Sequence, residues 1–336
     1  MRKLHESSFD LAVSFNFPVE LRSLSTAYLI QWTKEFACDS VVGRDVCALL
    51  QEALDNLGLN VKIQAIFNDT VGVMAACCAK DPECAIGLIV STGLNCCYSE
   101  KATRINRPFA KFAEGGELII NTECGGFGSY GSMDQFLTKY DKMVDESSVA
   151  PGKQILEKMV STLYIGELAR LVILEATEKK LLFNGHLPER LAVANSFTSQ
   201  FLFDIDRDPA HVYVSTEVVL RERFKITCIR KMDMVNIRYI CRALVTRSGN
   251  VVAAIVACLI NRMGRHRTTI GVDGAFFRFS SMFPAILVET VTRLIPYSYT
   301  FKLKLIDDGT GKGAAAIIGA TKAIVLPAPR FTVFRF

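Results

Sequence analysis

The sequence predicts an α/β fold, because strand and helix patterns alternate through most of its 336 residues. Hydrophobic residues make up 50% of the chain and charged residues 22%, which is typical of a globular protein with a large buried core. No internal repeat and no low-complexity segment interrupts the alternation. A chain of this length forms one large domain or two ordinary ones.

In the N-terminal half, apolar residues that alternate or run continuously predict strands at residues 11–17, 61–67, 85–90, 95–98 and 118–121. Pro18 ends the first of these strands, because proline has no N–H to donate to a neighbouring strand. Apolar side chains at helical spacing predict helices at residues 43–57 and 71–80. The second helix directly follows a strand, so a strand-to-helix junction is expected between them.

In the C-terminal half, strand and helix patterns continue to alternate after a longer helical region. The patterns predict one long helix at residues 151–179, a mostly helical region at 182–267 with weak boundaries, strands at 268–272 and 299–306, a helix at 283–295, and a glycine-rich loop at 307–313 followed by an alanine-rich helix.

The charge pattern argues against a nucleic-acid partner. The formal net charge is only +5, from 39 Lys and Arg against 34 Asp and Glu, and it is spread along the chain. The densest basic stretches, at residues 221–231 and 262–267, lack interleaved aromatic residues, so we expect them to be solvated faces. The apolar run at residues 251–260 is too short to span a bilayer, and no transmembrane segment is expected. Charges near the first residue also make a signal peptide unexpected.

The cysteines predict reduced thiols rather than disulfides or a metal site. There are 11 of them, an odd number, and most lie inside apolar runs. No Cys-x-x-Cys pair is present and the four histidines are scattered, so no zinc site is expected. We therefore expect buried, reduced thiols in a cytoplasmic protein.

Asp69 is a candidate general base, because it lies where the strand at residues 61–67 ends and a helix begins. A carboxylate at such a junction is held by rigid elements and opens into the cleft that the strand end faces, which suits proton abstraction from a substrate hydroxyl. The alternative is that Asp69 or Thr70 simply caps the helix.

Two glycine-containing turns are candidates for phosphate binding. The loop at residues 307–313 is not a Walker A motif, since Ile306 stands where the first glycine is required and Gly313 where a hydroxyl residue is required. A strand, a glycine-rich turn and a small-residue helix start still suit a nucleotide, although a tight structural turn explains the same pattern. Residues 91–93, between two strands, form the second candidate, and a simple hairpin turn is the alternative.

Carboxylates, amides and a lysine follow several predicted strands, and together they suit a sugar, whose hydroxyl groups both donate and accept hydrogen bonds. Taken singly, each of these residues is better explained as an exposed or capping polar group. They are Thr33, Lys34, Asn68, Asp69, Asn95, Glu123 and Glu157.

Eight segments resemble the eukaryotic hexokinase and glucokinase family in their order and approximate spacing. They are Phe15-Asn16-Phe17-Pro18, Trp32-Thr33-Lys34, Ile66 to Gly72, Ile86 to Asn95, Asn121-Thr122-Glu123, Pro151 to Gln154, Gly271 to Gly274 and Gly309 to Ala315. The resemblance runs from about Leu11 to Ala323 and covers the C-terminal two-thirds of one hexokinase domain. It implies the actin-like ATPase (ribonuclease H-like) fold, in which two α/β domains close on a sugar.

The resemblance also implies roles for individual residues in an ATP-dependent transfer of phosphate to the 6-hydroxyl of glucose or a related hexose. Asp69 matches the general base. The residues that match the sugar site are Asn16, Phe17, Pro18, Thr33, Lys34, Asn68, Asn95, Glu123 and Glu157. The residues that match the ATP site are Thr92, Gly93, Ser199, Asp273, Gly274, Gly309, Thr310 and Gly311. ATP and Mg²⁺ are the implied cofactors, without a metal site made of protein side chains alone.

The resemblance divides the chain into a small-domain remnant at residues 1–68, a large domain at 69–306 and a returning segment at 307–336. The small domain is expected to be incomplete, because the family's first phosphate loop, an acidic residue followed by Gly-Gly-Thr-Asn, has no counterpart here. Asn16 stands where the family has serine, and Cys124-Gly125 replaces Trp-Gly. Three explanations stay open: a hexose kinase, a non-catalytic sugar-binding or regulatory relative, and an incomplete gene model.

Overall fold

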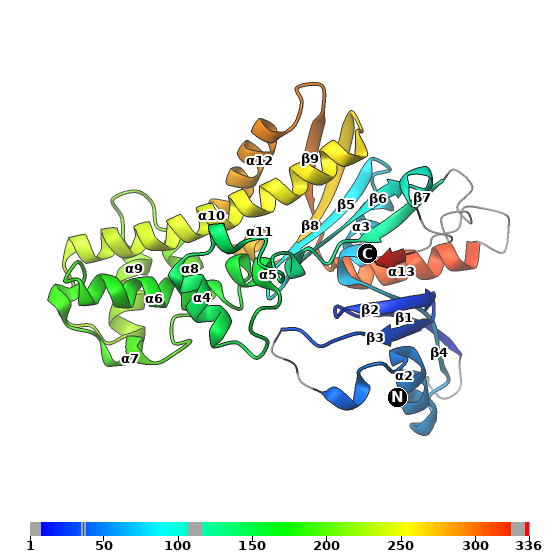
Figure 1. Ribbon diagram of the computed structural model, residues 1–336, viewed down its shortest axis with the longest axis horizontal. Helices are drawn as coiled ribbons and strands as arrows, with labels where there is room; N and C mark the ends of the chain where they lie inside the picture. The colour runs from blue at the N-terminus through cyan, green and yellow to red at the C-terminus, as the bar shows by residue number, and fades with distance from the viewer. Residues whose placement is uncertain (1–7, 35, 37, 107–115, 324–332, 336) are drawn as a thin grey trace.

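The computed structural model describes residues 8–34, 36, 38–106, 116–323 and 333–335. It contains a small lobe near the N-terminus, a larger lobe built on a six-stranded sheet, and a layer of helices that extends to one side of that sheet (Figure 1). The α/β fold class predicted from the sequence is confirmed.

The described part of the small lobe contains two pairs of strands, the helix α2 and a 3₁₀ turn at Asp39–Val41. β1 (Phe9–Ser14) pairs in parallel with β4 (Val61–Phe67), and β2 (Val19–Ser23) pairs antiparallel with β3 (Thr26–Leu29). α2 (Val46–Asn56) begins at Asp45, whose carboxylate accepts from the N–H groups of Cys47 at 3.0 Å and Ala27 at 3.1 Å. The helix cap therefore also ties α2 to the hairpin.

Two expectations for the small lobe were wrong. The first strand ends at Ser14 and not at residue 17, so residues 15–17 are released from the strand. The β2–β3 hairpin was missed, although residues 19–23 alternate in polarity, because the apolar residues are few and the turn is short.

The large lobe is built on a mixed sheet with the strand order β10-β7-β6-β5-β8-β9. Its strands are β5 (Cys84–Val90), β6 (Leu94–Lys101), β7 (Glu117–Asn121), β8 (Arg267–Asp273), β9 (Thr300–Leu305) and β10 (Val333–Arg335). β5, β6 and β7 form an antiparallel meander, whereas β8 and β9 run parallel to β5. The ends of β5 and β8 consequently lie side by side, and both precede residues of the candidate site.

Helices cover both faces of this sheet (Figure 1). α3 (Asp69–Cys78) and α13 (Gly309–Ala323) lie on the face toward the small lobe, and α10 (Lys231–Met263) and α12 (Phe283–Leu294) lie on the other. α3 and α13 cross with their backbones in contact, since a Cβ atom on Gly313 would lie 2.2 Å from the carbonyl oxygen of Gly72. Only glycine permits so close an approach.

The glycine-rich loop expected at residues 307–313 is mostly helix, which corrects that prediction. α13 begins at Gly309, and the turn that precedes it comprises only Asp307 and Asp308. Gly309 lies against Val73 of α3, so its small size serves the packing of the two helices.

The helical layer contains shorter helices packed beside the first part of α10. They are α4 (Lys139–Glu146), α5 (Ile155–Val160), α6 (Ile165–Glu178), α7 (Glu189–Ala192), α8 (Ser199–Asp206) and α9 (Val214–Val218), and α11 (Ala275–Phe279) follows β8. The single helix expected at residues 151–179 is in fact two, α5 and α6. It breaks because Ser161 is extended and the N–H of Thr162 donates to the carbonyl of Ser91, in the β5–β6 turn, at 2.8 Å.

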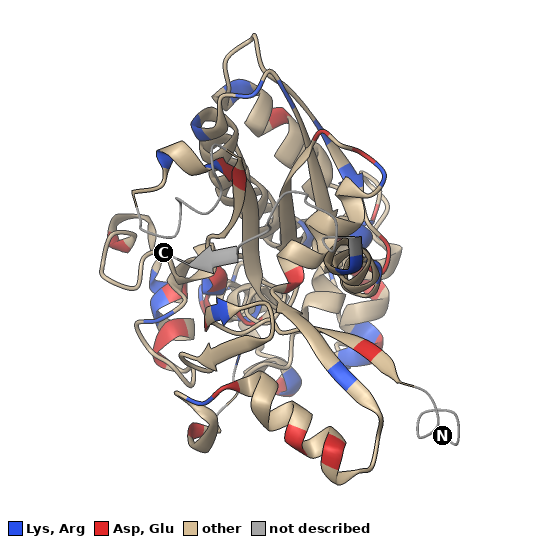
Figure 2. Cartoon of the chain, turned by 90° about the vertical axis from the view of Figure 1, so that its right-hand side faces the viewer, with Lys and Arg blue, Asp and Glu red and all other residues tan. Residues whose placement is uncertain are grey.

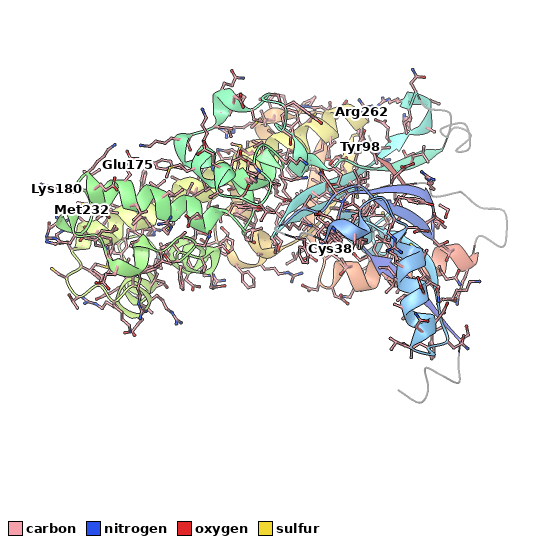
Figure 3. The ribbon with its side chains drawn as sticks, turned by 60° about the horizontal axis from the view of Figure 1, so that its bottom comes forward. Cys38, Tyr98, Glu175, Lys180, Met232 and Arg262 are labelled. Atoms are coloured by element: carbon pink, nitrogen blue, oxygen red, sulfur yellow. The ribbon has the colours of Figure 1, made fainter. Side chains whose placement is uncertain are left out.

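α10 is long and apolar enough to cross a membrane by composition alone, but half of its most apolar stretch is buried inside the protein, as in a core helix. Its last turns are fixed to the sheet by Arg262, which donates to the hydroxyl of Tyr98 at 2.9 Å and to Glu100 at 2.6 Å (Figure 3). Acidic and basic residues are interspersed over the elements of both lobes (Figure 2).

Candidate functional site

A cavity of about 450 Å³ lies between the two lobes, a size suited to a small molecule. The residues that line it are Asn16, Phe17, Thr33, Lys34, Phe36, Asp69, Ile89, Ser91, Thr92, Gly93, Leu94, Asn95, Glu123, Gln154, Glu157, Asp273 and Gly274. They come from the small lobe, from the start of α3, from the end of β5 and the start of β6, from the segment after β7, from the end of β8, and from the start of α5.

Asp69 is the first residue of α3, and its carboxylate faces the cavity. The cap of this helix is Asn68, whose side-chain oxygen accepts from the N–H of Thr70 at 3.0 Å. The pKa of Asp69 is raised by burial, and this rise is opposed by the positive charge of Lys34 and by a hydrogen bond from Asn16. A carboxylate with a raised pKa at the end of a rigid strand–helix junction has the properties of a general base.

Three amide side chains form a chain of hydrogen bonds along one wall. The side-chain N–H₂ of Asn95 donates to Asn121 at 2.9 Å and to Asn68 at 3.3 Å, and that of Asn121 donates to Glu123 at 2.8 Å. The chain orients Asn95 and Glu123 before any ligand arrives.

Glu157 is the most buried carboxylate of the wall, with only 4% of its surface exposed. One of its oxygens, Oε2, accepts from the N–H of Leu94 at 2.8 Å, while Oε1 is buried without a partner among the described residues. Burial raises the pKa of this carboxyl to about 7, with only partial compensation from the Leu94 N–H and Lys34. An unpaired buried oxygen is costly, so this atom is suited to accept a hydrogen bond from a ligand.

Three lining residues have left-handed backbone conformations, with φ of +58° at Lys34, +50° at Glu123 and +54° at Gln154. None of them is glycine, and such conformations in other residues are concentrated at functional sites. The ammonium group of Lys34 donates to the carbonyl of Asn16 at 2.8 Å and lies 5.5 Å from the centre of the Phe17 ring.

An aromatic cluster supports the small-lobe side of the cavity. The Trp32 ring meets the Phe17 ring edge-on at a centroid distance of 4.7 Å and stacks on Phe36 at 6.2 Å. Trp32 is the only tryptophan of the sequence and directly precedes Thr33 and Lys34. Its fluorescence therefore reports on this wall of the site.

The other end of the cavity is formed by the β5–β6 turn and the end of β8. A Cβ atom on Gly93 would lie 2.6 Å from both Glu157 and Lys34, and one on Gly274 would lie 2.3 Å from the carbonyl of Val90. The guanidinium of Arg278 donates to the carboxylate of Asp273 at 2.7 Å and to that of Asp307 at 2.7 Å. These contacts join the end of β8 to the turn before α13.

Most of the predicted site residues line this cavity, and six lie outside its lining. Asn68 lies just behind the wall, bonded to Asn95. Pro18 is buried, and its carbonyl accepts from Ile30. Ser199 is the first residue of α8, and Gly309, Thr310 and Gly311 form the first turn of α13.

Gln154, Phe36 and Asn121 belong to the site and were not predicted as site residues. Gln154 lies in the Pro151 to Gln154 segment that carried the resemblance, so that segment contained the signal. Phe36 lies two residues from Lys34, and its role depends on packing that the sequence does not display. Asn121 lies in the Asn121-Thr122-Glu123 segment of the resemblance, and it acts through a hydrogen bond to Asn95, 26 residues away in the chain.

Two α/β lobes that enclose a cavity of carboxylates, amides and one lysine define a protein of the actin-like fold with a site suited to a polyhydroxy ligand. Comparison with known proteins agrees with this class. Two family models, both described as hexokinase, match residues 1–79 and 85–320. The chain belongs to the hexokinase family, whose members are phosphotransferases.

Among curated relatives, the hexokinase of Schistosoma mansoni is 42% identical over 314 residues, which are 94% of this chain and 69% of the relative. Hexokinase-1 of Rattus norvegicus is 35% identical over 325 residues, 94% of this chain and 34% of the relative. A solved structure of the Schistosoma mansoni hexokinase complexed with glucose has a TM-score of 0.88 at 42% identity, covering 94% of this chain and 70% of that one. The chain thus spans about two-thirds of the first relative and about one-third of the second.

Proposed function

We propose that this protein is an ATP-dependent hexose kinase that transfers the γ-phosphate to the 6-hydroxyl of glucose or a related hexose. The observation that carries the proposal is the buried Oε1 of Glu157, which has no partner in the part of the chain that the structure describes, in a wall that also presents Asn95 and Glu123. A sugar hydroxyl that donates to this atom would relieve its desolvation. The glucose in the related Schistosoma mansoni structure supports the same ligand.

In this proposal Asp69 removes the proton of the attacking hydroxyl. Its raised pKa makes it a stronger base than an exposed aspartate, and Lys34 still favours the ionised form. The amide chain and Glu157 hold the sugar so that one hydroxyl faces Asp69, and positioning of this kind supplies much of the rate in phosphoryl transfer. Closure of the two lobes would exclude water as a competing acceptor.

ATP with Mg²⁺ is the proposed phosphate donor, and Mg²⁺ would neutralise charge on the phosphates. Thr92 and Gly93, on the β5–β6 turn, and Asp273 and Gly274, at the end of β8, border the cavity next to Asp69. The first turn of α13 lies beside Asp273, because a Cβ atom on Gly309 would be 3.4 Å from its carboxylate oxygen. A hydroxyl, exposed backbone N–H groups and a helix start are the groups that hold phosphate in proteins.

The test compares glucose binding with glucose 6-phosphate formation in the parent and in Asp69→Asn. We expect the parent to bind glucose and to form product when MgATP is added, and the variant to lose roughly 10²- to 10⁴-fold in kcat while it keeps glucose binding. Full activity in the variant would exclude Asp69 as the base. Glucose binding without any phosphorylation by the parent would instead support the sugar-binding, non-catalytic alternative.

A further inference from the structure

Two thiols meet directly behind the candidate sugar site. Cys96 on β6 and Cys124 at the start of the η4 turn (Cys124–Gly126) have their Sγ atoms 3.6 Å apart, and the Sγ of Cys96 is also 3.1 Å from the Thr122 hydroxyl. Cys96 is fully buried and Cys124 is partly exposed. All the cysteines of the chain are free thiols.

Each of these cysteines directly follows a residue of the cavity wall. Cys96 follows Asn95, whose side-chain oxygen accepts from the N–H of Cys96 at 2.8 Å. Cys124 follows Glu123, which has a left-handed backbone. Any displacement of the two sulfur atoms is therefore transmitted to the wall through one peptide unit on each side.

We propose that Cys96 and Cys124 form a modification site, at which a hydroperoxide oxidises the two thiols to a disulfide that weakens hexose binding. The formation of the disulfide is argued from the geometry alone, whereas its effect on hexose binding rests on the proposed function. Nothing in the sugar-binding role requires two thiols at these positions.

The chemistry is balanced by one molecule of hydrogen peroxide. The thiol of Cys124, the more exposed of the two residues, attacks one peroxide oxygen, which gives a sulfenic acid and one water. The Cys96 thiol then attacks the Cys124 sulfur, which forms the S–S bond and releases the second water, so two thiols are oxidised and one peroxide is reduced. The hydrogen bond that the Cys124 thiol shares with Cys96, together with burial, holds the pKa of Cys124 well above its ordinary value, so the reaction is slow compared with that of an exposed thiolate.

The disulfide must change the shape of the wall. Sulfur atoms bonded to each other are about 2.05 Å apart, so the pair has to close by roughly 1.5 Å from its present separation. The η4 turn packs on α5, where a Cβ atom on Gly125 would be 3.1 Å from the Cβ of Glu157. Since the turn has little room beneath it, we expect Glu123 to shift away from the position that the Asn121 hydrogen bond now fixes.

Glucose binding and disulfide formation must affect each other to the same degree, because the two equilibria are thermodynamically linked. If the disulfide raises the dissociation constant of glucose by some factor, bound glucose must oppose the disulfide by the same factor at equilibrium. Typical coupling between sites is about 5- to 150-fold, and we expect an increase of about tenfold here.

The experiment treats the full chain with hydrogen peroxide, blocks residual thiols and maps disulfides by mass spectrometry of unreduced peptides. Glucose affinity is measured by Trp32 fluorescence before oxidation, after it, and after reduction with dithiothreitol. We expect a Cys96–Cys124 link as the main product, a reversible rise in the glucose dissociation constant of about tenfold, and less linkage when glucose is present. Cys124→Ser and, independently, Cys96→Ser should abolish the effect of peroxide on affinity, whereas Cys258→Ser, at an exposed position on α10, should preserve it.

Three outcomes would overturn the proposal. The first is no link between the two cysteines. The second is a main product among Cys77, Cys78 and Cys84, whose thiols interact with one another. The third is a formed link with unchanged glucose affinity. Mapping in the parent needs no variant, so it decides the first two even if a serine variant does not fold. If the reduced parent fails to bind glucose at all, the proposed function is at fault, and the mapped link still decides the modification site.

Discussion

Glu157 gives the protein a pH dependence that its glutamine variant should remove. Burial raises the pKa of this carboxyl from 4.5 to about 7 in the folded protein. Below pH 4.5 it is protonated in both the folded and the unfolded state. Between 4.5 and 7 only the folded state keeps the proton, so the free energy of unfolding falls as pH rises, and the loss is complete above 7.

The size of this loss follows from the two pKa values. Each pKa unit corresponds to about 1.4 kcal/mol, so ionising buried Glu157 costs roughly 3 kcal/mol across the interval. Glu157→Gln keeps an oxygen for the Leu94 N–H and carries no charge at any pH. We therefore expect the variant to gain stability relative to the parent by roughly 2.5 kcal/mol between pH 5 and pH 8, while its glucose affinity decreases.

Urea unfolding followed by Trp32 fluorescence at pH 5, 6, 7 and 8 measures this difference, because all other titrating groups are common to both proteins. Glu175→Gln is a matched control. The Lys139, Lys179 and Tyr140 side chains lower the pKa of Glu175 to about 2, so its contribution changes only at more acidic pH. The control should be offset from the parent by a constant amount, and a constant offset for Glu157→Gln as well would refute the reasoning.

Three further substitutions test the contact between α3 and α13 and the cap of α2. Gly313→Ala should destabilise the protein by roughly 3 kcal/mol or more in urea unfolding, because its Cβ would lie 2.2 Å from the Gly72 carbonyl. Gly319, on the same helix, has open space around it, so Gly319→Ala should stabilise the protein by roughly 0.5–1 kcal/mol. Equal changes in stability for the two glycine substitutions would contradict the close contact between α3 and α13. Asp45→Ala should cost about 1–2 kcal/mol through loss of the α2 cap, measured in the same way, and an unchanged midpoint would exclude that role.

The sequence predicted five strands of the large-lobe sheet, because their apolar residues alternate or run continuously between turn residues, but it missed β10. It failed where tertiary contacts override a local pattern. The helix at residues 151–179 kept its apolar spacing through Ser161, yet it breaks there because Thr162 bonds to the β5–β6 turn. The domain boundaries proposed from the resemblance stay a prediction.

Asp69, Asn95 and Glu157 were predicted from the family resemblance, because their residue types alone left a capping role open, and all three line the cavity. The candidate site was not predictable where a residue acts through a neighbour. Asn121 matters because its amide lies between Asn95 and Glu123, and this depends on the register of β6 and β7. Gly313 was taken for part of a nucleotide loop, although its observed contact is with the helix that carries Asp69.

The contact between Gly72 and Gly313 also has a consequence for the time order of folding. The two glycines are roughly 240 residues apart in sequence, so closing this contact is among the costliest steps in chain entropy. During synthesis, α3 leaves the ribosome long before α13, and until then its apolar surface beside Gly72 has no helix to pack on. The helix that begins with Asp69 thus obtains its partner only after roughly 240 further residues have been synthesised, and apolar surface exposed in this way promotes aggregation of a nascent chain.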